Sequence, residues 1–148
     1  MPVVTSRVRV AAPIERVWAV LADVPGQPRW MRDLVAVELE GVGPVGVGTR
    51  AIGHVRIAGL RQDDPVEIDG FDPPRHFGLR HLGAFRGRGD FRLVPVPGGT
   101  LLTWREELWS PVARVRLAGP PLDALLWPVF AFVFRADLRR LRELAERD

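Results

Sequence analysis

Residues 122–144 read LDALLWPVFAFVFRADLRRLREL, and this stretch decides the fold that the sequence predicts. Its apolar residues recur every three or four positions, which is the spacing of a helix with one broad apolar face. We therefore predict a long helix from the Gly119-Pro120-Pro121 break to the C-terminus, with a bend near Trp127 because Pro128 removes a backbone hydrogen bond. The predicted face consists of Leu122, Leu125, Leu126, Val129, Phe130, Val133, Phe134, Asp137, Leu138, Leu141 and Leu144.

Short runs of alternating apolar and polar residues precede this helix, from residue 34 to residue 109, and predict six strands. Segments rich in residues that accept turn conformations separate these runs. They are 41–48, 59–64, 72–74, 83 and 97–99. The predicted strands are Leu34–Glu40, Thr49–Ile57, Pro65–Phe71, His76–Leu82, Arg86–Pro95 and Thr100–Trp109.

The first thirty residues predict one more strand and two helical segments. Residues 4–10 alternate in the same way, and Pro13 suits the first turn of a helix that stops near Asp23. A short second helix or turn then carries Trp30. Hairpin-linked strands form one antiparallel sheet, and only the last helix is long and apolar enough to cover it. The predicted class is α+β, with a seven-stranded curved sheet wrapped around the C-terminal helix in the order β-α-α-β6-α.

The composition predicts one globular domain spanning residues 1–148. The N-terminus alternates arginine with valine rather than forming an apolar leader, and no apolar run reaches the ~20 residues that a spanning helix needs. We therefore expect a cytoplasmic protein without stable membrane insertion. The chain has no cysteine, which excludes disulfides and thiolate metal ligands.

The missing residue types narrow the chemistry further. The chain contains no lysine and no tyrosine, so side-chain acid–base work falls to Asp, Glu or one of His54, His76 and His81. The spacing of these histidines does not suit a metal site, and we predict neither a metal nor a cofactor. The net charge of +3 comes from arginines that alternate with acidic residues on the predicted strands, which favours a solvated sheet face over nucleic-acid binding.

The order of elements, and the residues that join them, resemble the START-like helix-grip superfamily, also called SRPBCC, and within it the polyketide cyclase/dehydrase-type branch. The resemblance covers nearly the whole chain. Its marks are residues 12–18 with Leu21 and Asp23, then Trp30, 47–50, 71–75, 98–100 and 138–146. These marks are turn, cap or core positions, so they indicate the fold rather than the chemistry.

The resemblance implies a tunnel between the curved sheet and the C-terminal helix, which members of the superfamily use for lipids, hormones, polyketides or other hydrophobic metabolites. The residues themselves support only a weaker expectation, a bent sheet. Gly53, Gly87 and Gly89 lie within predicted strands, where glycine often marks bending or the close approach of another group.

If the more apolar face of each strand points inward, an apolar lining follows. Any single member of it can equally be ordinary core, because such pockets are lined by the same residue types as cores. The inward residues are Val55, Ile57, Val66, Ile68, Phe77, Leu79, Phe91, Leu93, Leu102 and Trp104. The predicted ligand-binding residues are Trp30, Val55, Phe77, Leu79, His81, Phe91, Trp104, Glu106, Leu126, Phe130 and Phe134.

Two ionisable residues, His81 and Glu106, share this inward face. A charged group on an apolar face must be paired, exposed or functional, because burying it alone is costly. Glu106 either reaches solvent or an arginine, or acts as a carboxylate in the cavity; His81 is either a rim histidine or part of the site. We expect His54 on the outer face, His76 in a turn, and Trp30 at the cavity mouth with its N–H near water.

Two functional hypotheses follow. The favoured one is binding of a hydrophobic small molecule. The alternative is a polyketide aromatase/cyclase or dehydratase in which Glu106, His81 or Arg80 moves protons. The middle of the last helix is apolar nearly all round, which predicts burial against a second subunit in a homodimer, lining of the cavity, or contact with a membrane. A third hypothesis is a lipid-transfer or cochaperone module.

Overall fold

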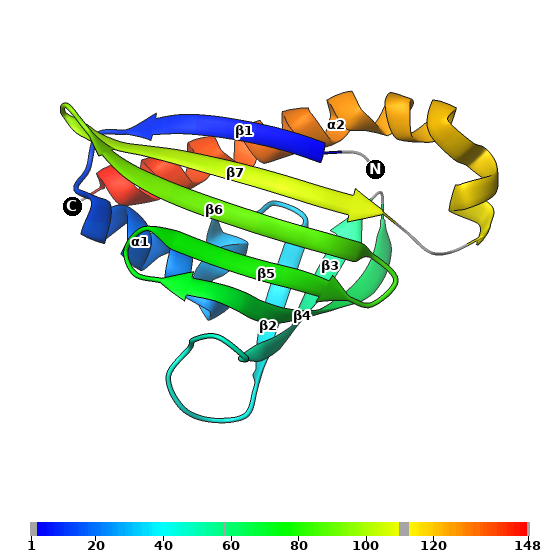
Figure 1. Ribbon diagram of the computed structural model, residues 1–148, viewed down its shortest axis with the longest axis horizontal. Coiled ribbons are helices and arrows are strands. Elements are labelled where there is room, and N and C mark those ends of the chain that lie inside the picture. Colours follow the sequence, from blue (N-terminus) through cyan, green and yellow to red (C-terminus); the bar gives the residue numbers. More distant parts are fainter. Residues whose placement is uncertain (1–2, 58, 110–112, 148) are drawn as a thin grey trace.

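The computed structural model describes the backbone of residues 3–57, 59–109 and 113–147, and the side chains of the same residues except 57 and 109–127. It confirms the predicted α+β helix-grip fold, in which α2 lies along one face of a curved antiparallel sheet (Figure 1). The strand order is β1-β7-β6-β5-β4-β3-β2. The elements are β1 Val3–Val10, α1 Ile14–Ala22, the short 3-10 helix η1 Val24–Arg29, β2 Leu34–Glu40, β3 Arg50–Ile57, β4 Leu60–Asp72, β5 His76–Leu82, β6 Arg86–Val96, β7 Gly99–Trp109 and α2 Ala113–Glu146.

Strand β4 begins five residues earlier than the predicted Pro65. The prediction was wrong because aspartate is rare in strands, so residues 61–64 resembled a loop. In the structure the turn after β3 is tighter and centres on Gly59, whose φ of 80° suits glycine. Asp63 then pairs with His54 across the ladder, with 2.7 Å between Oδ1 and Nδ1. This cross-strand pair compensates for the poor strand propensity.

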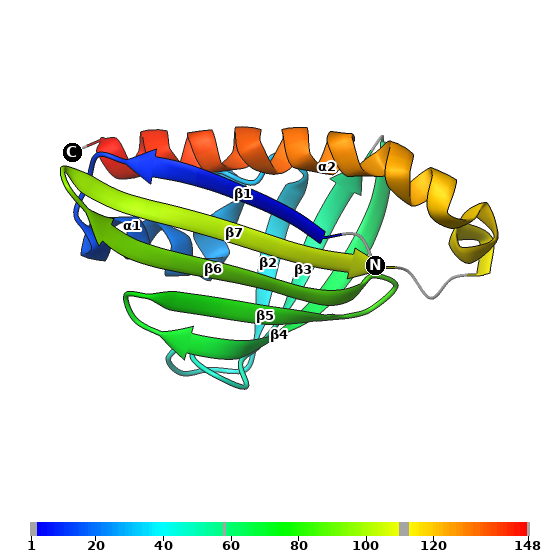
Figure 2. The same cartoon turned by 45° about the horizontal axis from the view of Figure 1, so that its top comes forward.

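Helix α2 also begins earlier than predicted, at Ala113 rather than after Pro121. The prediction treated Gly119-Pro120-Pro121 as a break, but proline can bend a helix without ending it. Figure 2 shows the axis of α2 turning within its yellow-to-orange part.

The apolar core lies between the concave face of the sheet, helix α1 and the C-terminal half of α2. Leu138 and Leu141 of α2 are buried against the sheet, and Val17 and Leu21 of α1 close the same end. The sheet contributes Val8, Val10, Ala51, Ile68, Phe77, Phe91, Leu93, Leu102 and Trp104. At the end of α2, the Glu146 Oε2 atom accepts a hydrogen bond of 2.9 Å from the Ala11 N–H and ties the helix to the strand that it covers.

Trp30 lies inside this core and not at a cavity mouth. Its ring is fully buried and makes edge-on contacts with Phe91 and Trp104 at centroid distances of 6.1 Å. Its Nε1–H has no hydrogen-bond partner within the described part of the chain. The position follows from α2, because Arg140 donates a hydrogen bond of 3.2 Å to the Trp30 carbonyl and holds this segment against the helix.

Asp137 of α2 anchors the same segment. Its Oδ1 atom accepts hydrogen bonds from the Arg32 backbone N–H at 3.2 Å and from Arg140 Nη1 at 3.0 Å. Burial raises the pKa of Asp137 to about 6, although the Arg32 hydrogen bond and the Arg140 charge lower it. The folded protein therefore holds the proton more tightly than the unfolded chain does.

Asp137→Asn should gain stability relative to the wild type as the pH rises through about 6. The raised pKa means that ionisation between pH 3.8 and about 6 costs the folded wild type stability, and asparagine avoids this charge while keeping an acceptor for the Arg32 N–H. Urea unfolding on both sides of this range measures the effect, which we expect on the order of 2 kcal/mol. A stability difference between the two proteins that does not change with pH would contradict the prediction.

Candidate functional site

The concave face changes character along its length, from a buried core to a partly open end. Phe77, Phe91, Leu93, Leu102 and Trp104 are buried, as the alternation of the strands predicts. Beyond them the inward side chains of Val55, Val66 and Leu79 are partly exposed, as are Phe130 and Phe134 on α2. The side chains of Ile57 and Leu126, two further predicted lining residues, lie outside the described ones.

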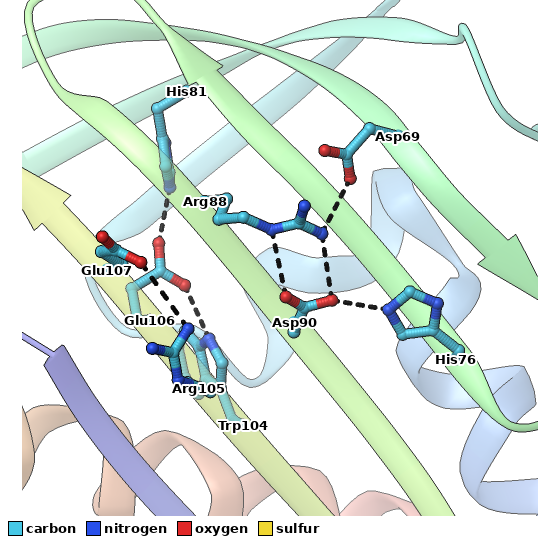
Figure 3. A network of polar contacts seen from close by, with 9 residues as sticks. All are labelled: Asp69, His76, His81, Arg88, Asp90, Trp104, Arg105, Glu106 and Glu107. Carbon is cyan, nitrogen blue, oxygen red and sulfur yellow. Dashed lines mark hydrogen bonds and ion pairs between the residues drawn. The ribbon is translucent and has the colours of Figure 1, made fainter.

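Four polar side chains meet where the core gives way to this open end; we call them the polar quartet: Asp64, His81, Trp104 and Glu106. The Nε2 atom of His81 lies 2.6 Å from Glu106 Oε1, and its Nδ1 atom lies 2.9 Å from Asp64 Oδ2. Trp104 Nε1 donates a hydrogen bond of 2.8 Å to Glu106 Oε2. Figure 3 shows how His81 of β5 reaches Glu106 of β7 across the intervening strand.

The intervening strand β6 permits this bridge because it carries glycine at the crossing point. Gly89 pairs with Glu106 on one side and with Leu79 on the other, and a Cβ atom at position 89 would overlap Glu106 Oε2. Gly87 pairs with His81 and has a φ of 119°, and a Cβ there would overlap the Glu107 carbonyl. Both glycines therefore mark close approach, one of the two meanings that the sequence suggests for them.

The quartet is largely buried and carries three charges. The side chains of Asp64, His81 and Glu106 are 13%, 11% and 6% exposed. Burial lowers the pKa of His81, but the hydrogen bonds and negative charges of Asp64 and Glu106 outweigh this effect and raise the pKa to about 10. His81 is thus a cation at neutral pH, held by both ring nitrogens, and it is not available as a general base.

An aromatic stack joins the quartet to α2. Trp104 stacks on Phe91 with 4.9 Å between ring centroids and contacts Phe134 at 4.2 Å. Phe130 lies one turn earlier in the helix and stacks 6.1 Å from Phe134. Phe134, one of the residues of α2 that the sequence predicts as ligand contacts, therefore lies directly beside the Trp104 ring of the quartet. Phe132 of the same helix is 69% exposed, and burial of this face in a homodimer stays a prediction.

Arg80 does not join this group, so the expectation that it points inward is wrong. Neighbouring residues of a strand point to opposite faces, and His81 occupies the inner one. The side chain of Arg80 is half exposed on the convex face, where it donates a hydrogen bond of 3.1 Å to Glu67 Oε1. Arg50 pairs with the other oxygen of the same glutamate, also at 3.1 Å.

The convex face also carries His76, which is a strand residue and not a turn residue. It opens β5 because its backbone pairs with β4 and β6. Its Nε2 atom lies 2.6 Å from Asp90 Oδ1, and Arg88 bridges Asp90 to Asp69 (Figure 3). Burial raises the pKa of Asp90, but the His76 hydrogen bond and the Arg88 charge hold it below its usual value. His54 also lies on this face, as expected.

The sequence did not point to Asp64, because the predicted strand began one residue after it. Had that strand been extended by five residues, the alternation would have aligned Asp64 with Val66 and Ile68 on the inner face. The spacing of these residues indicates a strand, but the low strand propensity of aspartate favoured a loop for residues 61–64.

Other features of the described residues are less suited to a functional site than the quartet. No group of three or more His, Asp or Glu side chains among the described residues could hold a metal ion. None of the helices, over the part of the chain that the structure describes, is long and apolar enough to cross a membrane. A hollow of about 540 Å³ beside the loop between β2 and β3 shares no residue with the quartet and is lined by Glu40, Gly41, Val42, Val47, Gly48, Thr49 and Arg50.

The chain matches a known family model and a related bacterial protein. A family model described as polyketide cyclase / dehydrase and lipid transport matches residues 1–146. An uncharacterized protein of Mycobacterium tuberculosis strain H37Rv is 30% identical over 141 residues, which cover 89% of this chain and 77% of that protein.

Two solved structures are also similar to this chain over nearly its whole length. The Zhui aromatase/cyclase from Streptomyces sp. R1128 is 27% identical with a TM-score of 0.76, covering 99% of this chain and 94% of that one. A protein of Thermus thermophilus has a TM-score of 0.78 at 22% identity, with 97% of each chain covered, and so shares the fold.

The His81 ring should stay protonated through the neutral range. Because its pKa rises from 6.5 in the unfolded chain to about 10 in the folded protein, the stability it contributes is complete below pH 6.5 and is lost as the pH rises through about 10. NMR titration of the ring carbon signals measures this directly. A midpoint near the ordinary histidine value would show that the ring is not held between two carboxylates.

Gly89→Ala should destabilise the protein and displace Glu106, because the new methyl group overlaps the carboxylate. We expect a loss on the order of 2 kcal/mol, since the buried His81 cation also loses a partner. Gly53→Ala is the matched control, because it lies within a strand of the same sheet and its Cβ would meet mainly a flexible Leu34 methyl at 3.1 Å. Equal losses in urea unfolding of the two variants would mean that position 89 has no special relation to Glu106.

Proposed function

The chain belongs to the polyketide cyclase / dehydrase and lipid transport family, and we propose that it binds a hydrophobic small molecule between the concave face and α2. The observation that carries this proposal is the polar quartet, which lies on an otherwise apolar face at the point where the core ends. A ligand would lay its apolar body over the open end of the face and its polar group at the quartet.

The energetics favour a binding role over a purely structural one. Burying two carboxylates and an imidazolium costs free energy that apolar side chains of similar size would avoid. The neighbouring residues Val55, Val66 and Leu79 are partly exposed, so the apolar surface beside the charges is not saturated by the protein itself. Ligand pockets combine these two features, an apolar lining and a few fixed polar groups.

The alternative is catalysis of the aromatase/cyclase or dehydratase type. It is supported by the similarity to the Zhui aromatase/cyclase and by the presence of acid–base side chains in the quartet. His81 would then act as a fixed positive charge, while Asp64 or Glu106 accepts and returns a proton. Binding is the better-supported function because it needs no proton transfer from groups that are already paired with a cation.

Leu79→Trp should weaken the binding of a neutral apolar dye such as Nile red by at least about tenfold, because the larger ring occupies the open end of the face. Val94→Trp is the matched control, since Val94 lies on the opposite face of the sheet and is 53% exposed. Fluorescence titration gives both affinities, and native mass spectrometry of the purified protein detects any co-purified ligand. Failure of the wild type to bind dye or ligand, or equal weakening in both variants, would contradict the proposal.

A further inference from the structure

The polar quartet has used all of its hydrogen-bond donors. The two ring N–H groups of His81 go to Asp64 and Glu106, and the indole N–H of Trp104 goes to Glu106. Carboxylates supply acceptors only. What remains is acceptor capacity, and its clearest site is Asp64 Oδ1, a buried oxygen that has no hydrogen-bond partner among the residues that the structure describes.

The net charge of the quartet also disfavours an anionic ligand. The imidazolium of His81 contributes one positive charge, and Asp64 and Glu106 contribute two negative charges, so the group carries a net charge of −1. The arginines described above, Arg50, Arg80 and Arg88, lie on the convex face and pair with carboxylates there. A second anion brought to the concave face would therefore meet a like charge where solvent screening is weak.

We propose that the ligand presents a hydrogen-bond donor, a hydroxyl or an ammonium group, to Asp64 Oδ1, and that the site rejects ligands whose polar end is a carboxylate. This inference rests on the proposed function and specifies its ligand class. A donor satisfies the unpartnered oxygen, whereas a carboxylate adds further acceptors and a second negative charge and leaves that oxygen unpaired.

One other buried donor has to be considered. Trp30 Nε1 also has no partner among the described side chains and backbone groups, and its N–H can donate to an acceptor group. However, the Trp30 side chain is fully buried in the core, between Phe91 and Trp104 on the sheet and the segment held by α2, whereas the Asp64 side chain is 13% exposed. A carboxylate could reach it only by displacing core side chains, so Trp30 does not provide an alternative anchor for an acid.

Three ligands that share one alkyl chain test the inference: decanol, decylamine and decanoic acid. At about pH 8 the acid is an anion and the amine is a cation. Displacement of Nile red from the wild-type protein should give decanol and decylamine affinities at least about tenfold higher than that of decanoate. If none of the three displaces the dye, the proposed function itself fails; if decanoate binds as well as decanol, only the ligand class is overturned.

Two neighbouring variants separate the role of Asp64 from the general cost of burying an anion. Asp64→Asn removes a negative charge and adds donors, so the preference for decanol over decanoate should fall by about tenfold. Asp63→Asn changes the adjacent residue, whose exposed side chain pairs with His54 on the other face, and should leave the preference unchanged. An unchanged preference in Asp64→Asn, with folding verified by circular dichroism, would overturn the assignment. If that variant does not fold, the ranking of the three ligands on the wild type still decides the question.

Discussion

One helix has to cover the whole concave face of a seven-stranded sheet, and this constraint determines where the protein is packed and where it is open. In the C-terminal half of α2, Leu138 and Leu141 belong to the same buried core as large side chains from β5, β6 and β7. Glu146 and Arg16 tie that end to the start of α1 through hydrogen bonds to backbone atoms. The rest of the helix extends towards the end of the sheet where the inward residues are smaller, partly exposed or charged (Figure 2).

The charged residues at that end are tolerated because they satisfy one another. A cation enclosed by two carboxylates is stable in a buried setting only when its geometry is fixed, and here the geometry comes from three different strands. The glycines of β6 leave the space that the bridge requires, and the Trp104 indole fixes the orientation of the Glu106 carboxylate. The lack of a side chain at Gly89 of β6 thus allows side chains of β5 and β7 to interact across that strand.

Much of this could be predicted from the sequence, and the failures have specific causes. The periodicities were strong enough to give the class, the order of elements and the inward direction of Phe77, Leu79 and His81. The errors arose where a residue has a poor propensity for the structure it adopts, as with Asp63 and Asp64 in β4 or the prolines in α2. The pairing of His81 with Glu106 could not be predicted, because it depends on the register of β5 and β7 against β6 and not on any local pattern.

The two faces of β5 carry separate ionic networks, and this arrangement protects the alignment of the strand. His76 and Arg80 bind carboxylates on the convex side, while His81 binds carboxylates on the concave side. A slip of β5 by one residue relative to β4 and β6 would turn Arg80 into the apolar interior and expose His81 and Phe77 to solvent. Every charge on the strand would lose its counter-ion at once, so misaligned forms of the sheet are penalised on both surfaces during folding.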